Sequence, residues 1–350
     1  MVAPQISVVM AVRDGERWLP GAIASIQRQT LSQFELIIID DGSTDQTPHI
    51  IDAQFRSDPR IIAIHQDRLG LVAALNRGLA ASRGQFIARL DADDIAQPQR
   101  LARQLEYLER HPEIGLLGTW AHKINEQGLV VGTLTPPPGT KALLALLART
   151  NPFLHSSIMM RKTVLERVGF YRTAFAGAED YDLWIRMSEI SDIANMPEYL
   201  IQYRIHSDSI SHTARVRQLF SSRLAQQAAE LRRTNGEDPA SELNAPPDWH
   251  APDTVNVPIY PDLAKLFRFL DLADVGNLQS AMGRVDVSAL SNRSFPLNRA
   301  ERRVAQIALL NLLKNGIAVN APRSTLLWHF IRLHPMRAVT LGYREFRGRA

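Results

Sequence analysis

Three carboxylates fall within four positions, directly behind an apolar stretch of the chain. The sequence "FIARLDADD" (86–94) contains Asp91, Asp93 and Asp94. Carboxylates this close repel one another, and each needs water or a partner. Since Asp is common in the turns that end strands, a turn is one explanation for the acids. The other is a divalent cation, because Mg²⁺ and Mn²⁺ prefer carboxylate oxygen as a ligand.

Charged residues also follow two other apolar runs. Arg13 comes directly after "ISVVMAV" (6–12), while Asp40 ends "FELIIID" (34–40) and Asp41 follows it. In a parallel sheet the C-terminal ends of the strands meet at one edge, and ligands bind there. Three charged strand ends on one edge therefore predict a polar ligand and a cation.

The elements that must position these ends alternate between two patterns. Short β-branched runs predict strands, and apolar residues at helical spacing predict helices between them. The strands are expected at 6–12, 34–40, 60–66 and 85–90, and the helices at 16–29, 44–55, 70–84 and 98–110. This alternation predicts an α/β fold, with a mainly parallel sheet flanked by helices on both faces.

The pattern changes after residue 111. Shorter strands are expected over 114–134 and 155–162, then a helix over 178–190 and a last strand over 198–206. Helical patterns return at 213–233, 262–316 and 323–347, and the segment 232–261 is rich in Pro, Asn and Asp, which predicts an irregular linker. We therefore expect one domain over residues 1–212, divided near residue 110, and a mostly helical extension over 213–350.

Composition excludes several classes of site. The 350 residues are 45% hydrophobic and 22% charged, which is a globular balance. With no cysteine, the chain has no disulfide and no zinc–thiolate site. A net charge of +4 does not indicate a nucleic-acid partner. The first residues predict a strand rather than a signal peptide, and no run approaches the ~20 apolar residues of a membrane span, so a cytoplasmic protein is expected.

The order of five motifs resembles the family 2 glycosyltransferases with a GT-A fold. These motifs are "VVMAVRDGERWLPGAIASIQRQT", "FELIIIDDGSTDQT", "GLVAALNRGL", "GQFIARLDADD" and "AEDYDLWIR", and the resemblance covers residues 5–212. It implies an inverting transfer of a sugar from a nucleotide-sugar, a UDP-sugar first of all, to an acceptor hydroxyl. It also implies that residues 1–110 form the nucleotide-binding half and residues 111–212 the acceptor half.

The resemblance assigns the acids after the fourth strand to a metal site. Asp93 becomes the ligand of Mn²⁺ or Mg²⁺, and Asp91 a second ligand or a ribose contact, while Asp94 is expected to cap the following segment. A cation on the diphosphate would stabilise the charge that the leaving group gains. Beyond the last strand, His206 is a candidate metal ligand and Arg204 a candidate phosphate partner.

Four residues are assigned to the nucleotide by the same resemblance. Asp41 is expected to accept from the base, with Arg13 beside it, although family members often carry Tyr-Asn where this chain has Arg13 and Asp14. Gly70 and Asn76 match the third motif. Each has an ordinary alternative: a helix cap for Asp41, a loop glycine for Gly70 and a mid-helix polar residue for Asn76.

The "ED" pair supplies the other half of the reaction. An acceptor hydroxyl loses its proton as it attacks the anomeric carbon, and a carboxylate within reach can take it. The resemblance makes Asp180 this general base and Glu179 a residue that orients the acceptor. His155 and Trp184 are assigned to the acceptor side, with packing as the alternative for both.

Competing functions lack a part that they require. A nucleotidyltransferase needs a glycine-rich phosphate loop after the first strand, and a haloacid-dehalogenase-type phosphatase needs a nucleophilic Asp where Arg13 stands. An EF-hand-like site needs a glycine and a distant Glu that "DADDIAQ" lacks. A catalytically inactive binding module would have lost the base or the metal carboxylates, yet both are present.

The last segment suggests a partner. Residues 323–350 combine leucines, Trp328 and Phe330 with several arginines, which is typical of a helix at an anionic membrane surface. Such a surface would suit a lipid-linked saccharide acceptor. The alternative is that the apolar stripe packs on the catalytic domain or on a second subunit.

Overall fold

A computed structural model describes residues 3–206, 215–249, 260–271 and 297–315, together with the single residues 290, 325, 329 and 332. The tail predicted to meet a membrane, residues 323–350, therefore lies outside the described residues except for three positions. Among the described residues, no helix is both long and apolar enough to cross a membrane.

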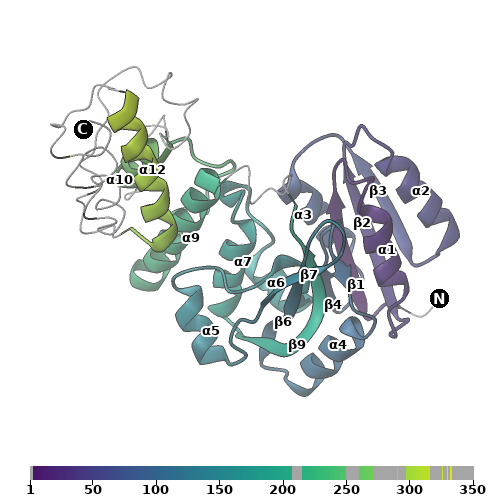
Figure 1. Cartoon of the computed structure of the whole chain (residues 1–350). Helices are drawn as coiled ribbons and strands as arrows, with labels where there is room; N and C mark the ends of the chain where they lie inside the picture. Colours follow the sequence, from purple (N-terminus) through teal and green to yellow (C-terminus); the bar gives the residue numbers. More distant parts are fainter. Residues whose placement is uncertain are drawn as a thin grey trace.

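A single nine-stranded sheet forms the centre of the molecule (Figure 1). Its order is β3-β2-β1-β4-β8-β6-β9-β5, and β7 pairs with β6 outside this path. The strands are β1 (Ile6–Val12), β2 (Phe34–Asp41), β3 (Ile61–Gln66), β4 (Phe86–Arg89), β5 (Ile95–Ala96), β6 (Ile114–Ile124), β7 (Val130–Leu134), β8 (Met159–Arg161) and β9 (Asp192–Arg204).

Parallel pairing dominates the first half of the sheet, as the sequence predicts. β1 lies between β2 and β4, and β3 pairs with β2, all in parallel. In the second half β8 runs antiparallel to both β4 and β6, and β9 is parallel to β6. The two short strands expected at 114–128 are one long strand, β6, which bends at irregular positions along its pairing with β9.

Helices cover both faces of this sheet (Figure 1). Every residue of β1 and β2 is buried, as in strands covered on both sides. Val9 and Ile37 point into one apolar cluster, and Val8 and Ile38 into the other. The helices are α1 (Leu19–Gln27), α2 (Thr47–Ser57), α3 (Leu71–Ala81), α4 (Arg100–Arg110), α5 (Thr140–Leu147), α6 (Lys162–Val168) and α7 (Glu179–Ser188).

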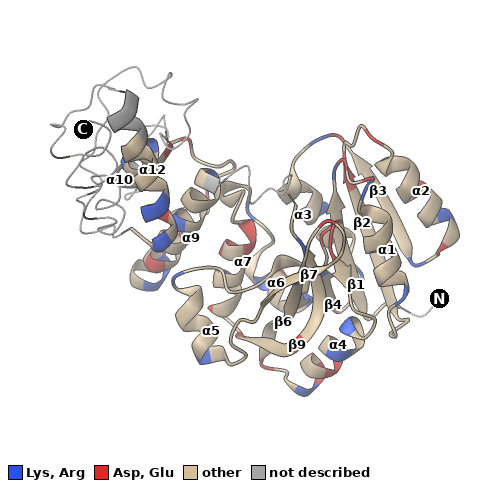
Figure 2. Ribbon diagram, viewed as in Figure 1, with Lys and Arg blue, Asp and Glu red and all other residues tan. Residues whose placement is uncertain are grey.

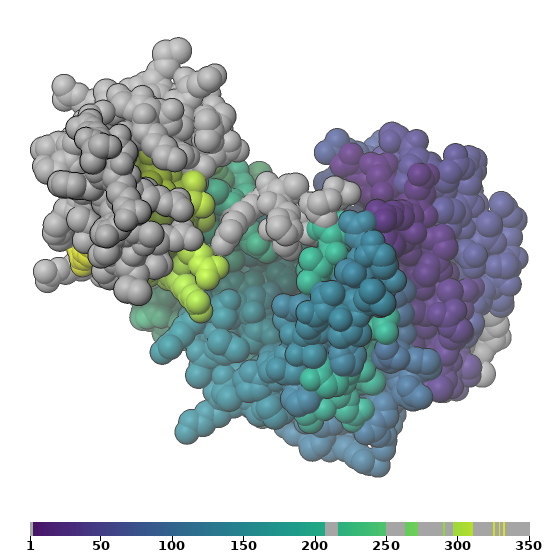
Figure 3. All heavy atoms as spheres, viewed as in Figure 1, coloured from purple at the N-terminus to yellow at the C-terminus, as the bar shows by residue number. Residues whose placement is uncertain are grey.

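The C-terminal part is helical where it is described. It contains α9 (Arg215–Asn235), α10 (Tyr260–Asp271) and α12 (Arg299–Asn315), which pack on one another beside α7 (Figure 1). Residues 236–249 contain no helix or strand, so the irregular segment begins after Asn235 rather than at 232. In the space-filling view the first strands and helices and the segments after residue 111 form one continuous body (Figure 3).

The register aligns the strand ends that the sequence singled out. Val12 pairs with Asp40 across β1 and β2, and Val9 pairs with Arg89 across β1 and β4. The residues that follow these strands therefore share one edge. Figure 2 shows acidic segments after β2, after β4 and at the start of α7.

Candidate active site

The acids after β4 are each held by a different partner. Asp91 is 2.5 Å from the Arg89 guanidinium and accepts a 2.8 Å hydrogen bond from Ser156 Oγ. Burial would raise the pKa of Asp91, but the charge of Arg89 and the hydrogen bonds from Ser156 and Arg89 outweigh it, and the net shift is downward. Arg89 is 1% exposed, so a buried cation stands directly behind this carboxylate.

Asp93 forms a pair with His206. Its Oδ2 lies 2.9 Å from His206 Nε2, although the two residues are far apart in the chain. Burial and the charge of Asp91 raise the pKa of Asp93, and the contact with His206 opposes that rise. β9 ends at Arg204, so the pairing of β9 in the sheet delivers His206 to the end of β4.

Asp94 does not cap the following segment, and this prediction is wrong. Its side chain is fully buried, and Oδ1 accepts a 2.8 Å hydrogen bond from the backbone N–H of Arg204. Burial, and then the charges of Asp93 and Asp91, raise the pKa of Asp94 well above its ordinary value. Asp94 therefore fastens the end of β9 to the β4 loop.

Arg204 is also held in place by backbone groups. Its guanidinium donates to the carbonyls of Asp93 at 2.9 Å and Asn125 at 3.0 Å, and it lies 4.2 Å from the centre of the Trp18 ring. Arg17 lies 4.1 Å from the same ring and pairs with Glu126 at 2.8 Å. Trp18 thus lies against two cations beside His206, whose ring centre is 6.2 Å away.

The loops after β1 and β2 are joined by reciprocal hydrogen bonds. Asp14 accepts from the Thr44 N–H at 2.8 Å and donates its own N–H to Ser43 Oγ at 2.9 Å. Gly15 N–H donates to Thr47 Oγ1 at 2.8 Å. Arg13 stands at this junction, partly exposed, with its Nε 3.3 Å from Asp14 Oδ2. These hydrogen bonds therefore hold the loop after β1 against the loop after β2.

Asp41 holds the loop before α3. Its two oxygens accept from the N–H groups of Leu69 and Gly70, each at 2.8 Å, and from Gln66 Nε2 at 2.7 Å. Gly70 has φ +92°, a left-handed conformation that favours glycine, and the space where a side chain would start is open. The predicted contact of Asp41 with a base stays a prediction.

Asn76 clamps the backbone of Tyr171. Its Nδ2 donates to the Tyr171 carbonyl at 2.8 Å, and its Oδ1 accepts from the Tyr171 N–H at 3.1 Å. Tyr171 Oη in turn lies 2.8 Å from His155 Nε2. The amide expected to face the nucleotide is thus engaged in joining α3 to the loop before α7.

His155 and Trp184 belong to one packed group. Trp184 is fully buried and meets His155 edge-on, with ring centres 5.8 Å apart. Burial lowers the pKa of His155 to about 3, and Arg89 adds to that effect, so the imidazole is neutral at ordinary pH. Trp184 is therefore packed against His155, and the predicted acceptor-side roles of both residues stay predictions.

Glu179 and Asp180 open helix α7. Asp180 accepts from Asn151 Nδ2 at 2.7 Å and from the Tyr181 N–H at 2.6 Å, and Glu179 accepts from the Gly177 N–H at 2.7 Å. Burial raises the pKa of Asp180 to about 6, and the charge of Asp91 adds to the rise. Burial and the charge of Asp180 raise the pKa of Glu179 to about 7. The α7 acids are therefore within electrostatic reach of the β4 acids.

Comparison with known proteins decides the family. The profile of Glycosyl transferase family 2 matches residues 7–169. An uncharacterized glycosyltransferase of Haemophilus influenzae is 32% identical, covering 59% of this chain and 68% of that protein. The O-antigen biosynthesis glycosyltransferase WbnJ of Escherichia coli is 34% identical, covering 61% of this chain and 84% of that protein. This chain belongs to glycosyltransferase family 2.

A third relative and two solved structures extend the comparison. The Escherichia coli UDP-Gal:alpha-D-GlcNAc-diphosphoundecaprenol beta-1,3-galactosyltransferase is 26% identical, covering 64% of this chain and 82% of that protein. TarS 1–349 of S. aureus with UDP-GlcNAc has a TM-score of 0.56 at 15% identity, covering 97% of this chain and 92% of that one. The mannosyltransferase PcManGT of Pyrobaculum calidifontis, with GDP-Man and Mn²⁺, has a TM-score of 0.53 at 18% identity, covering 97% and 84%.

These structures confirm the GT-A fold and nothing finer at such identities. This chain spans 53% of the longer TarS chain. The predicted family and fold are thus both confirmed for this glycosyltransferase, whereas the individual roles of its residues stay predictions.

Two side chains of the glycosyltransferase are suitable ligands for a divalent cation. Asp93 and His206 present a carboxylate oxygen and an imidazole nitrogen at one point, both of which Mn²⁺ accepts. Asp91 is the weaker candidate ligand, since Arg89 and Ser156 already occupy its oxygens. No group of three His, Asp or Glu side chains among the described residues could hold a metal alone. The remaining ligands of a cation would have to come from diphosphate and water.

The sequence alone did not identify several residues of the candidate site of this glycosyltransferase. Arg89 had a signal, a charge inside an apolar strand directly before the acids. Arg17 and Trp18 lie within the first of the five motifs, but no pattern singled them out. The partners of these two residues, and of Asn151 and Ser156, come from distant segments. Tertiary contacts alone reveal their places in the site.

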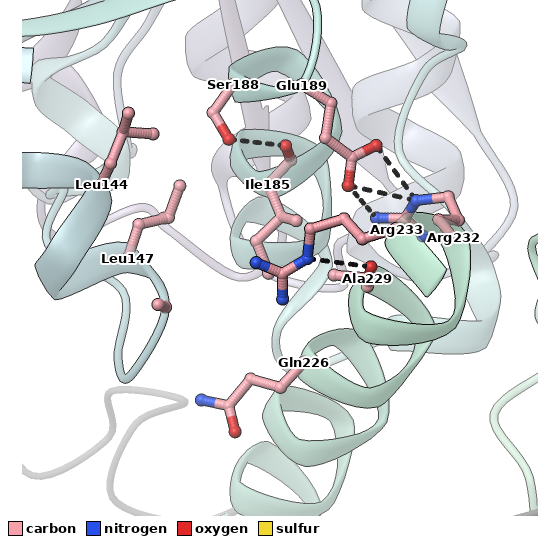
Figure 4. A pocket seen from close by; sticks show the side chains of 10 residues that line it. Leu144, Leu147, Ile185, Ser188, Glu189, Gln226, Ala229, Arg232 and Arg233 are labelled. Atoms are coloured by element: carbon pink, nitrogen blue, oxygen red, sulfur yellow. Dashed lines mark hydrogen bonds and ion pairs between the residues drawn. The ribbon is translucent and has the colours of Figure 1, made fainter. Parts of the chain in front are cut away.

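A hollow of about 550 Å³ lies elsewhere, between α5, α7 and α9 (Figure 4). Leu144, Leu147 and Ile185 line one part of it, while Arg232 pairs with Glu189 in another. None of the residues predicted to bind donor, metal or acceptor lines this hollow. The candidate active site of the glycosyltransferase is therefore the edge formed by the ends of β1, β2 and β4 with the start of α7.

Proposed function

We propose that this family 2 glycosyltransferase transfers a sugar from a nucleoside-diphosphate sugar to a saccharide hydroxyl with inversion at the anomeric carbon. The observation that carries the proposal is that the charge of Asp91 acts on both Asp93, which is paired with His206, and Asp180, which is the neighbour of Glu179. One pair suits the diphosphate of a donor and the other the hydroxyl of an acceptor.

The nucleotide would lie along the joined loops after β1 and β2. Asp41 and Gly70 supply the base end, Arg13 the nearby cation, and Asp91 and Arg204 the diphosphate end. Asn76 would support this site from behind, because it fastens α3 to the backbone of Tyr171. A uracil base offers an N–H that a carboxylate such as Asp41 can accept. The solved TarS complex with UDP-GlcNAc supports a UDP-sugar as the first donor to test.

Asp93 and His206 would hold Mn²⁺ or Mg²⁺ against the diphosphate. The cation, when bound, stabilises the negative charge that the leaving diphosphate acquires. The Mn²⁺ in the related mannosyltransferase structure supports this choice of metal. Arg204 stands beside the pair and keeps Asp93 in place through its hydrogen bond to the Asp93 carbonyl.

Asp180 would act as the general base. As the acceptor oxygen bonds to the anomeric carbon, the bond from that carbon to the diphosphate breaks and its electron pair leaves with the diphosphate. The acceptor proton passes to an oxygen of Asp180, which Asn151 and the Tyr181 N–H hold in a fixed orientation. Attack from the face opposite the nucleotide inverts the configuration. Glu179, whose pKa burial and the charge of Asp180 raise to about 7, would be the neighbour that hydrogen-bonds the acceptor.

We propose a lipid-linked saccharide of surface-polysaccharide biosynthesis as the acceptor. Relatives are named for O-antigen and amylovoran biosynthesis, and one is named as acting on alpha-D-GlcNAc-diphosphoundecaprenol. These names support the class of acceptor, and the sugar and linkage follow from experiment.

A donor panel tests the proposed function. The purified chain is incubated with Mn²⁺, UDP-, GDP- and dTDP-sugars and a polyprenyl-diphosphate saccharide, and nucleoside diphosphate release is measured. We expect release with one donor, its loss in excess EDTA, and an inverted linkage by NMR. Binding of nucleotide without any transfer or hydrolysis would show an inactive module. A retained anomeric configuration would exclude Asp180 as the base of a single displacement.

A further inference from the structure

The turn between β6 and β7 carries an unusual group of exposed side chains. We call residues 127–131 the hairpin tip. Leu129 is 65% exposed, and Val130 and Val131 are each 57% exposed. Elsewhere in the described residues, large apolar side chains with comparable exposure occur singly, such as Phe55 on α2. Three in succession call for an explanation, because runs of exposed apolar residues are rare without a function.

Both faces of the tip are uncovered. Successive side chains of a strand point to opposite faces, so Val130 and Val131 face opposite ways. Within the described part of the chain β7 pairs only with β6 and has no charged residue to protect its outer edge (Figure 2). The base of the hairpin, by contrast, is packed, since Ile124 is 1% exposed and Leu134 contacts the core. The side chains of the tip are thus exposed, whereas those at the base of the hairpin are packed.

The tip is fastened to the rim of the active site. Arg204 donates to the carbonyls of Asn125 at 3.0 Å and Glu126 at 3.3 Å, and with its Nε to the carbonyl of Asp93 at 2.9 Å. Arg17 pairs with Glu126 at 2.8 Å from the other side. One guanidinium therefore joins the turn to the residue proposed to hold the cation.

We propose that the hairpin tip inserts into the surface of the membrane that carries the lipid-linked acceptor. A protein partner lying on one face would cover Val130 or Val131 but not both, whereas a fluid apolar phase covers both faces at once. The charges near the tip are compatible with an anionic lipid surface. Lys123 lies next to the tip, across from Gly132, and Arg17 neutralises the carboxylate of Glu126. This inference rests on the proposed function for the identity of the acceptor.

Insertion of so few side chains gives weak, reversible binding. It should be weaker than the ~10⁴ M⁻¹ of a single myristoyl chain, yet sufficient to keep the active site near acceptor diphosphates at the lipid surface. Its expected effect is on reactions at a vesicle surface and not on reactions in solution.

Vesicle sedimentation tests the tip directly. The full chain is spun with vesicles of phosphatidylcholine and phosphatidylglycerol, beside the triple variant Leu129→Thr, Val130→Thr, Val131→Thr, which keeps the β-branched shape of both valines. The matched control is Phe55→Thr, which removes an exposed apolar side chain from α2. We expect the triple variant to bind at least ~10-fold more weakly, the control to bind like the wild type, and Val131→Trp to bind more tightly.

Transfer assays separate this inference from the proposed function. The triple variant should lose about tenfold in transfer to an acceptor embedded in vesicles and keep its rate with a water-soluble acceptor. Equal vesicle binding by wild type and triple variant, or none by the wild type, overturns the inference, as does a dimer that the triple variant abolishes. Transfer to the water-soluble acceptor without vesicles reports on the proposed function alone, so the absence of both transfer and donor hydrolysis there would refute that function while sedimentation still decides the role of the tip.

Discussion

At the end of β4, three neighbouring carboxyl groups avoid mutual repulsion in three ways. Asp91 is ion-paired to the buried Arg89, Asp93 is paired with His206, and Asp94 is buried with a strongly raised pKa. The sequence suggested a cation for Asp93 and Asp91, and a helix or turn cap for Asp94. Arg89 already supplies one permanent positive charge, which leaves Asp93 as the carboxylate that is free to exchange its partner for a metal.

Loss of the Asp93 carboxylate should weaken metal binding. Asp93→Asn removes the charged ligand while keeping its shape, so the affinity for Mn²⁺ in the presence of UDP should fall by ~100-fold or more, since even outer-shell changes cost 10–100-fold. Titration calorimetry measures this directly. Asp52→Asn, which alters an exposed carboxylate on α2, is the control and should bind Mn²⁺ normally. An unchanged affinity in Asp93→Asn would assign the metal elsewhere.

Replacement of the proposed base should affect turnover and leave donor binding intact. Asp180→Asn keeps the size of the side chain and one of the two acceptor oxygens but cannot take a proton, so kcat should fall by the ~10²–10⁴ typical of general-base removal. The donor KM should change little. Steady-state kinetics with both variants, Asp180→Asn and Glu179→Gln, distinguish the two acids. A larger loss in Glu179→Gln would move the base to Glu179.

The raised pKa of Asp180 predicts the pH dependence of transfer. Burial raises this pKa to about 6, and the base works only when ionised. Activity should therefore be half-maximal near pH 6, rise to its full value at higher pH and fall about tenfold per pH unit at lower pH. A profile of kcat against pH measures this fall at low pH, and the Asp180→Asn variant should not show the fall. A wild-type profile that stays flat below that pH would contradict the assignment.

At the scale of the element, the first turn of helix α7 holds the proposed catalytic acids, and the following turns hold the ion pairs that fix the helix in place. Asp182 is fully buried and binds the guanidinium groups of Arg172 and Arg186, while Arg186 also donates to carbonyls of the loop before it. This network fixes the helix so that Glu179 and Asp180 project from its first turn. The clamp of Asn76 on Tyr171 fixes the same loop from α3.

Asn76→Ala distinguishes a clamp from a nucleotide contact. Removing the amide leaves a buried N–H and carbonyl of Tyr171 without partners, so the free energy of unfolding should fall by about 1–3 kcal/mol. Chemical denaturation measures this loss, and the donor KM should stay close to that of the wild type. A raised donor KM with unchanged stability would instead support the nucleotide role predicted from the sequence.

At the scale of the whole molecule, the C-terminal helices share a core with the catalytic helix. Phe220 and Leu224 of α9 are buried in the same apolar cluster as Trp184 and Leu183 of α7. Polar contacts join the two as well: Asp238 binds Arg172, and Arg232 binds Glu189. We propose that residues 213–350 are an extension that completes the acceptor half rather than an independent domain.

Truncation after residue 212 should therefore destabilise the catalytic part. Removing α9 exposes the apolar side of α7, and each large side chain left exposed costs about 1.5–3 kcal/mol of burial. The fragment 1–212 should unfold at a lower temperature than the full chain or be insoluble, as measured by thermal denaturation. A fragment that melts like the full chain and hydrolyses donor at the full rate would show that the extension is independent.

The sequence by itself determined the fold class and predicted the edge of the sheet at which the candidate site lies. Buried strands such as β1 and β2 are continuous apolar runs, and a parallel sheet brings their charged ends to one edge, so local patterns were sufficient. Motif order was enough for the family. The sequence predicted the roles of individual residues less well, since the capping role predicted for Asp94 was wrong.

Only the tertiary structure decided which side chains work together. His206 reaches Asp93 because β9 returns beside β5 and β6, and Asn76 meets Tyr171 through the packing of α3. The exposure of the hairpin tip is also invisible in sequence, because "LVVGTL" reads as an ordinary strand. Hydrogen bonds, burial and charge–charge effects depend on distances between remote segments, and a one-dimensional pattern does not contain those distances.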